Sequence, residues 1–295
     1  MSIISILVFG AALGCVLALL SVGYSLVYGV GGIINLSHGA YYILTAYIIF
    51  WLIDFRVVTY PIAIIIGLSL IALLGIFTYL ALIKPIQHNE IGVMIVTFAL
   101  AFLIEQAILV YEGSKPEEIK DIALIPFAAG QINIFGTMID AQYVVIMIAA
   151  VVILSALILF IKKSKLGKSI RAVSQDHDAA RLMGINVNLI LMFVLTLSAV
   201  LAGIAAILYV SVTPIYPNDG WDYLLLSMSV VILGGLGSLP GSVIGAFIIS
   251  FSRFIFFYWV DIPYNVAYSG IIHLAVIVVM LIFRPRGILG KKERT

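Results

Sequence analysis

The residues of this sequence most suggestive of chemistry form the run Lys-Leu-Gly-Lys-Ser at positions 165–169. Gly-Lys-Ser ends the phosphate-binding loop of many nucleotide-binding proteins, in which backbone N–H groups surround the phosphates. That loop also needs a glycine five positions before the glycine of Gly-Lys-Ser, and Lys162 occupies this position. We therefore predict no nucleotide site here and no hydrolysis of ATP by this chain alone.

The other ionisable residues form no pattern typical of an enzyme or a metal centre. The four histidines and the single cysteine lack metal-ligand spacing, and no Ser/His/Asp arrangement for nucleophilic catalysis is evident. Glu105, Arg253 and His273 lie within apolar stretches, where a charged group is costly and must face protein or water. Structural pairing is favoured over transport chemistry for Glu105 and Arg253. For His273 both alternatives stay open. We expect no enzyme activity and no cofactor.

The polar sequence SQDHDAARLMGIN, which begins at Ser174, predicts a two-turn helix. Asp176 can accept backbone N–H groups of the first turn, and Gly184 can end the helix in a left-handed conformation. Three apolar residues at spacing i, i+3, i+4 share one face of this helix: Ala179, Leu182 and Met183. A short apolar face in polar surroundings favours docking on a partner, and the alternative is a helix that lies on lipid headgroups.

The elements that carry these residues are membrane helices. The chain is 63% hydrophobic and 10% charged, and its apolar runs of about 20 residues can each cross a ~30 Å hydrocarbon core. These features predict an all-α polytopic membrane protein, a single transmembrane domain over 1–295 with about eight transmembrane helices. The apolar spans are 3–29, 40–53, 60–83, 91–111, 141–161, 189–211, 223–260 (a broken pair) and 266–283.

Charge predicts how the spans are oriented. Eleven of the 16 basic residues fall in the loop 162–188 and the tail 284–295, which the positive-inside rule puts in the cytoplasm. The acidic loops 112–121 and 212–222 are then expected outside, and so is the N-terminus. The segment 223–260 must enter and leave by the outer side.

The first limb of that segment, about 11 residues before GGLGSLPG, is too short to span a membrane at 1.5 Å per residue. We therefore predict a re-entrant half-helix that turns at this glycine-rich sequence.

Two apolar segments, 27–42 and 230–246, are interrupted by glycines with polar side chains between them. Backbone without helical hydrogen bonds cannot face lipid, and paired broken segments are typical of a translocation path. The alternative is that the glycines only let helices pack closely. The residues predicted to line a path are Gly31, Gly32, Asn35, Ser37, His38, Gly39, Gly234, Gly235, Gly237, Ser238, Pro240 and Gly241.

Three blocks together carry a family resemblance: SVGYSLVYGVGGIINLSHGAYYILTAYI (21–48), SKLGKSIRAVSQDHDAARLMGINVNLI (164–190) and VVILGGLGSLPGSVIGAFI (230–248). The chain resembles the LivH-type membrane permease subunits of branched-chain amino-acid ABC importers. The resemblance extends from about residue 10 to the RPRGILG sequence at 284–290. Related permeases for urea and short amides share much of this pattern, so these substrates are the alternative to branched-chain amino acids.

The resemblance implies a set of partners in the inner membrane of a prokaryote. They are a second permease subunit, usually of the LivM type, two cytoplasmic ABC ATPases and an extracytoplasmic substrate-binding protein. It also implies that SQDHDAARLMGIN is the coupling helix that docks on an ATPase, which adds Asp178 and Ala180 to the docking residues. Family members often have a Glu-Asp pair near its start, whereas this chain has Gln175 and Asp176. We assign no specific contact to that carboxylate.

The expected mechanism is mechanical. Closure of the ATPases would move the coupling helix as a lever, and the helices with broken segments would rock between outward- and inward-open states. Substrate would pass between the two permease subunits. The competing hypothesis is an ion-driven secondary transporter, in which His38, the only ionisable residue inside either broken segment, would take part.

Overall fold

The computed structural model is a helical bundle, and it describes residues 3–55, 58–118, 130–134, 136–260, 266–284 and 287–290. Residues 285, 286 and 291–295 of the predicted basic tail lie outside the described residues. The longer helices are α1 (Ile3–Gly31), α2 (His38–Asp54), α3 (Tyr60–Phe77), α4 (Glu90–Glu112), α5 (Gln142–Lys163), α8 (Val187–Val210), α9 (Asp219–Gly234), α10 (Leu239–Val260) and α11 (Val266–Phe283). A π-helical turn (Thr78–Ile83) and a 3₁₀ turn (Lys84–Ile86) extend α3, and two short helices, α6 (Lys165–Val173) and α7 (His177–Leu182), lie between α5 and α8.

The helices follow the apolar runs closely, because a backbone in lipid must satisfy its hydrogen bonds within the helix. Within the described residues, six helices are long and apolar enough to cross a membrane. The all-α polytopic class is therefore confirmed, whereas the expected number of about eight spans is not established, since α2 has 17 residues and α9 has 16.

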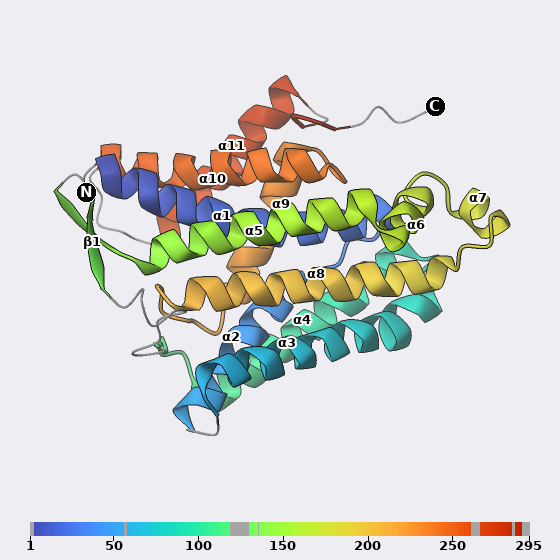
Figure 1. Cartoon of the computed structure of the whole chain (residues 1–295), viewed down its shortest axis with the longest axis horizontal. Helices are drawn as coiled ribbons and strands as arrows, with labels where there is room; N and C mark the ends of the chain where they lie inside the picture. Colours follow the sequence, from blue (N-terminus) through green and yellow to red (C-terminus); the bar gives the residue numbers. More distant parts are fainter. Residues whose placement is uncertain are drawn as a thin grey trace.

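Two helices form the centre of the bundle. The most apolar window is 67% buried in both α1 and α8, but only 33% buried in α3 and α4 and 28% in α5. The outer faces of α3, α4 and α5 expose large apolar side chains, as lipid-facing helices do. Figure 1 shows α1, α5, α8 and α10 running along the long axis of the molecule, with α7 beyond one end.

A β-hairpin was not expected from the sequence. Strands β1 (Gln131–Ile134) and β2 (Thr137–Asp140) pair antiparallel, with Gln131 opposite Asp140. They lie at the end of the bundle opposite α7 (Figure 1). An isolated bridge between Glu117 and Ile215 joins the two acidic loops, so the structure brings together the loops expected on one side of the membrane.

The first limb before the glycine-rich turn is longer than the expected length of about 11 residues, because helix α9 begins at Asp219 and has 16 residues, but it is still too short to span a ~30 Å hydrocarbon core. The turn at 235–238 reaches the α7 end of the bundle. There Gly237 lies against Gly29, two residues before α1 ends, and a Cβ on Gly29 would be 3.0 Å from the Gly237 Cα. Helices α9 and α10 form a hairpin whose turn lies beside the end of α1, and α9 is its short limb.

Candidate functional site

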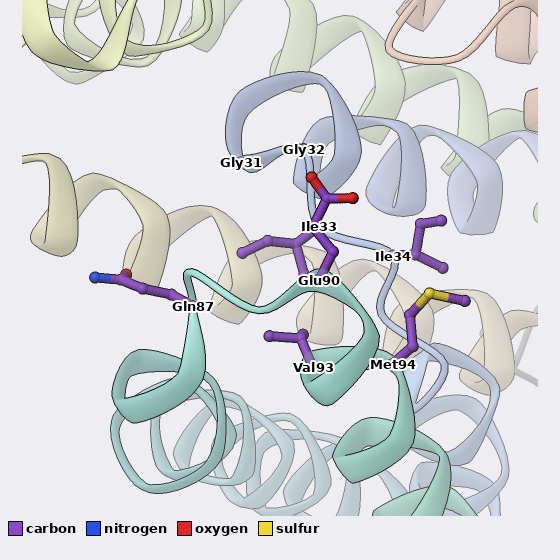
Figure 2. Close-up of a pocket in the computed structure, with 8 residues that line it drawn as sticks. All are labelled: Gly31, Gly32, Ile33, Ile34, Gln87, Glu90, Val93 and Met94. Atoms are coloured by element: carbon purple, nitrogen blue, oxygen red, sulfur yellow. The ribbon is translucent and has the colours of Figure 1, made fainter.

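The first broken segment connects α1 to α2 through a stretch of backbone without helical structure. Gly32 has a φ of +64°, which favours glycine because it has no Cβ. Four residues of this segment, from Gly31 to Ile34, line a pocket together with Gln87 and residues of the first turns of α4. Figure 2 shows the carboxylate of Glu90 directed toward the Gly31–Gly32 turn. Gly31 and Gly32, both predicted to line a path, therefore lie at a pocket near the α7 end.

Asn35 and Ser37 organise the chain just before α2. The Asn35 Oδ1 atom accepts the Ser37 N–H at 3.0 Å and the Ser37 hydroxyl at 2.6 Å. The Ser37 hydroxyl also shares a hydrogen bond with the Tyr41 hydroxyl at 2.9 Å. The backbone N–H of Leu36 donates to Thr97 Oγ1 of α4 at 3.1 Å. These bonds hold the non-helical backbone inside the protein, as its burial requires.

His38 connects three helices. Its ring is completely buried, with Nε2 3.0 Å from the Leu20 carbonyl oxygen and Nδ1 3.2 Å from the Ser198 hydroxyl. Because a carbonyl oxygen only accepts, Nε2 carries the proton of this bond. Both ring nitrogens are engaged in contacts that join α1, α2 and α8, which is the arrangement of a structural histidine.

The two half-helices α2 and α9 begin side by side at a junction of glycines. A Cβ on Gly39 would lie 2.0 Å from the Gly220 carbonyl oxygen, and a Cβ on Gly220 would lie 2.1 Å from Glu105 Oε1. Glu105 is 2% exposed, and its carboxylate lies at the N-terminus of α9. Its Oε2 atom has no hydrogen-bond partner within the described residues, so the expected structural pairing of Glu105 stays a prediction.

The second broken segment is packed backbone to backbone. A Cβ on Gly241 would lie 2.1 Å from the Gly234 carbonyl oxygen, so these two glycines let α9 and α10 meet. The Ser238 carbonyl accepts the Ser242 N–H at 2.9 Å, and the Ser238 hydroxyl accepts the Gly241 N–H at 3.3 Å. Pro240 is the second residue of α10, where its missing N–H costs nothing.

The chain after α11 closes the turn between α9 and α10. The N–H groups of Ile288 and Leu289 donate to the carbonyls of Leu233 and Gly234, each at 2.9 Å. These are carbonyls of the last turn of α9, which have no partner within the helix. Gly235 has a φ of +100°, and a Cβ there would lie 2.4 Å from the Gly290 nitrogen. In this structure the glycines of the second segment therefore serve close packing.

The predicted helix in SQDHDAARLMGIN is confirmed as α7. Asp176 Oδ1 accepts the N–H groups of Asp178 at 2.8 Å and Ala179 at 3.0 Å. These bonds hold the pKa of Asp176 below its usual value. The cap therefore contributes stability above the ordinary aspartate pKa and loses it as the pH falls through the lowered pKa, so it is intact at neutral pH.

The end of α7 is a glycine turn. Gly184 has a φ of +79°, its N–H donates to the Arg181 carbonyl, and the Ile185 N–H donates to the Ala180 carbonyl. This pair of bonds is the Schellman pattern, in which a left-handed glycine satisfies the last carbonyls of a helix.

Helix α7 exposes the apolar residues predicted to dock. Leu182 is 89% exposed and Met183 is 81% exposed, and Asp178 and Ala179 are also exposed. Ala180, included among the docking residues, points inward and is only 3% exposed. Its side chain therefore anchors α7 to the rest of the protein.

A residue that the sequence reasoning missed connects α7 to the bundle. The Nε2–H of His177 donates to the Val30 carbonyl of α1 at 2.7 Å. Val30 lies directly before the Gly31–Gly32 turn, so α7 is tied to the start of the first broken segment. No local sequence signal could have indicated this bond, since the two residues are 147 positions apart.

Gly167 of the Gly-Lys-Ser sequence has a structural role. A Cβ there would lie 2.3 Å from the Ile161 carbonyl oxygen, because α6 folds back tightly on the end of α5. The Ser164 hydroxyl caps α6 by accepting the Gly167 N–H at 2.8 Å, and the Arg171 guanidinium donates to the Ile161 carbonyl. The run is a helix–helix corner and not a phosphate loop.

These features define a class of protein. Apolar helices fill the bundle, two of them are interrupted inside it, and a short amphipathic helix projects from one end. Such a molecule is a polytopic transport protein of the membrane, with a surface on which a partner can act.

Comparison with known proteins gives the family. Residues 6–281 match the family described as "Branched-chain amino acid transport system / permease component", and the chain belongs to this family. It is a membrane permease subunit and not an enzyme. Membership of a family of ABC importer permeases implies ATPase and substrate-binding partners.

Several relatives match almost end to end. The high-affinity branched-chain amino acid transport system permease protein BraD of Pseudomonas aeruginosa is 27% identical over 97% of this chain and 95% of its own length. The LivH permease protein of Escherichia coli strain K12 is 24% identical over 96% of this chain and 94% of its own. The probable LivH permease protein of Methanocaldococcus jannaschii is 30% identical over 93% of this chain and 88% of its own.

A solved structure has a similar fold. PsaBC from Streptococcus pneumoniae in complex with Fab aligns with a TM-score of 0.53 at 13% identity, over 95% of this chain and 92% of that chain. At this identity the similarity concerns the fold alone.

Proposed function

We propose that this chain is the LivH-type subunit of an ABC importer that moves branched-chain amino acids across the inner membrane of a prokaryote. The proposal takes its substrate class from the named transport systems of the relatives. The observation that carries the coupling to ATPases is α7, whose apolar residues Leu182 and Met183 project into solvent. A buried anchor, Ala180, and a capped beginning and end hold this helix in shape.

In this proposal the α7 end faces the cytoplasm and the N-terminus lies outside. Helix α7 contacts the end of α1 through His177, and the α9–α10 turn contacts it through Gly237. Residues 287–290 pack on that turn. The loop 162–188 and the start of the basic tail are therefore at one end, as the positive-inside rule requires if both are cytoplasmic.

The proposed mechanism follows the contacts from α7 inward. An ATPase that moves α7 pulls on Val30 through His177. Val30 precedes the Gly31–Gly32 turn, whose non-helical backbone is free to change direction. The pocket at this turn would then widen or close, and Asn35 and Ser37 belong to the moving part of the path. His38 and Gly39 hold the start of α2 against α1, α8 and α9 while this segment moves.

The proposed assembly contains this chain as a single transmembrane domain, 1–295. Its partners are a second permease subunit of the LivM type, two cytoplasmic ATPases and one extracytoplasmic binding protein that supplies selectivity. Substrate passes between the two permease subunits.

The alternatives have less support. Urea or short amides are not named among the substrates of the near full-length relatives cited above. An ion-driven transporter would use His38, but both of its ring nitrogens are engaged in bonds that hold α1, α2 and α8 together.

The test is purification of the tagged chain from its host in mild detergent, with measurement of the ATPase activity that copurifies. The variant Leu182→Asp/Met183→Asp should lose the ATPases, because two acidic side chains replace the apolar contact. Ile132→Asp, an exposed apolar residue of the hairpin at the other end, is the matched control and should keep them. Wild-type protein that purifies without ATPase activity would overturn the proposal.

A further inference from the structure

The two half-helices that meet at the glycine junction differ at their N-termini. The N-terminus of a helix carries a partial positive charge and N–H groups without partners in the helix, so it attracts anions. At α9 an acidic group of the chain is already present, because a Cβ on Gly220 in the first turn would lie 2.1 Å from Glu105 Oε1. At α2 no side chain caps the first turn, although Ser37 occupies the capping position. The chain thus supplies an acidic group to one half-helix and none to the other.

Two buried hydrogen-bond donors near the start of α2 have no partner. Asn35 is 2% exposed, and its Nδ2 makes no hydrogen bond within the described structure. Because Oδ1 of the same amide binds the Ser37 N–H, Nδ2 is held at the N-terminus of α2. Tyr24 is 4% exposed, its hydroxyl is also without a partner, and its ring stands edge-on to His38 with 5.6 Å between centroids. Donors buried in this way are costly unless a ligand takes up their hydrogen bonds.

We propose that the N-terminus of α2 binds the carboxylate of the transported amino acid as it crosses the membrane. The ligands are the first N–H groups of α2, the Asn35 amide and the Tyr24 hydroxyl. The site rests on the proposed function, which makes an amino acid the substrate, and adds where its charged end is received. Neutral donors and a helix dipole stabilise a carboxylate less strongly than a buried arginine does. Such weaker binding lets the substrate leave the site during transport.

Apolar residues beside these donors suit a branched side chain. Tyr24 packs with Leu224 and Val231 of α9 in a small cluster apart from the main core, and Ile34 packs against it. Ile34 also lines the pocket at the α7 end (Figure 2). The cluster therefore connects the proposed site to that pocket through a single residue.

The structure is closed around this site, because Asn35, Ser37 and His38 are all buried. Binding requires the segment 33–36 to separate from α9. That segment follows the Gly31–Gly32 turn to which α7 is tied, so the same movement that the ATPases would drive opens the site.

The test replaces Asn35 by aspartate in the complete transporter, expressed with its partners in cells that lack other leucine uptake. Asn35→Asp keeps the acceptor for the Ser37 N–H and places an acidic oxygen where the amide donor was. The α2 terminus then resembles that of α9, and the substrate carboxylate is repelled. We expect maximal [14C]leucine uptake to fall at least about tenfold. The leucine concentration that gives half-maximal uptake should stay unchanged, because the affinity of the binding protein sets it. Asn89→Asp, the exposed cap of α4, is the matched control and should transport normally.

Tyr24→Phe tests the site without a change of charge. Loss of one hydrogen bond to a carboxylate should lower maximal uptake severalfold, and by about tenfold at the most. The amount of complex and its basal ATPase activity should stay normal. If the Asn35→Asp protein does not assemble with its partners, uptake by Tyr24→Phe alone decides whether the site exists. Normal uptake by either assembled variant would overturn the site. Wild-type cells that take up urea or acetamide but no leucine would instead overturn the proposed function.

Discussion

The segment around Gly31–Gly39 and the segment around Gly234–Gly241 both interrupt membrane helices with glycine, yet they are built in different ways. The first leaves α1 through an unwound stretch, lines a pocket and holds a buried donor without a partner, the Asn35 Nδ2 atom. The second is a tight turn whose free carbonyls are satisfied by the N–H groups of Ile288 and Leu289. Both contain the same residue type, but only the first has room and unmet hydrogen bonds.

We infer that this difference separates the segment that moves during transport from the segment that stays in place. The first segment is tied to α7 by one hydrogen bond, from His177 to Val30. The second is fixed by contacts with α1, with α10 and with residues 287–290. A movement of α7 should therefore displace the Gly31–Gly32 turn more easily than the second segment. We infer that the second hairpin is the support against which the first segment moves.

The largest expected effect is that of Gly241→Ala, because the new Cβ would meet the Gly234 carbonyl oxygen at 2.1 Å and only backbone movement can relieve it. We expect a loss of about 3 kcal/mol of stability, measured as a lower melting temperature of the detergent-solubilised protein. Gly92→Ala is the control, since its Cβ would meet only the Asn89 side chain, at 3.2 Å. Equal stability of the two variants would show that the second segment is not a rigid support.

Leu289→Pro tests the closure of the α9–α10 turn. Proline removes the N–H that donates to the Gly234 carbonyl, and a buried carbonyl without a partner costs about 1–3 kcal/mol. Hydrogen exchange at residues 233–238 should become faster. Leu289→Ala keeps the N–H and should leave exchange unchanged; if it speeds exchange as much as proline does, the side chain and not the backbone closes the turn.

Gly32→Ala tests whether the first segment needs a conformation instead of close packing. Nothing lies within 4 Å of the new Cβ, so its cost comes from a φ of +64° and should be about 1–2 kcal/mol. Gly136→Ala, in the turn of the β-hairpin, is the control, with a φ of +84° and the same open space. We expect similar losses in melting temperature but slower leucine uptake only for Gly32→Ala. Slower uptake in both variants would show that the Gly31–Gly32 turn has no special role in transport.

His177→Ala should have the smallest effect on stability, about 0.5–1.5 kcal/mol for one hydrogen bond. Its main consequence should be less leucine taken up per ATP hydrolysed, because α7 would no longer pull on Val30. Arg181→Ala, which removes only the exposed ion pair with Asp178, should leave this ratio unchanged. An unchanged ratio in His177→Ala would show that force reaches the bundle by another route.

The candidate site could be predicted where it depends on neighbours in the sequence. Helix α7 begins after Asp176 and ends before Gly184 as expected, because capping bonds form within a few residues. Ala180 was grouped with the docking residues, and its inward direction depends on how α7 packs against the bundle. The β-hairpin was missed, since a pair of four-residue strands gives little signal beside long apolar runs.

The sequence by itself determined the membrane class, the positions of the apolar helices and the two places where helices break. These features follow from hydropathy and from the conformational freedom of glycine, both of which are local. Only the tertiary structure decided what each break does. Whether a glycine faces a pocket, as Gly32 does, or another backbone, as Gly241 does, depends on which distant segment lies beside it. The same holds for His177 and Val30, because no local pattern records a contact between residues so far apart in the chain.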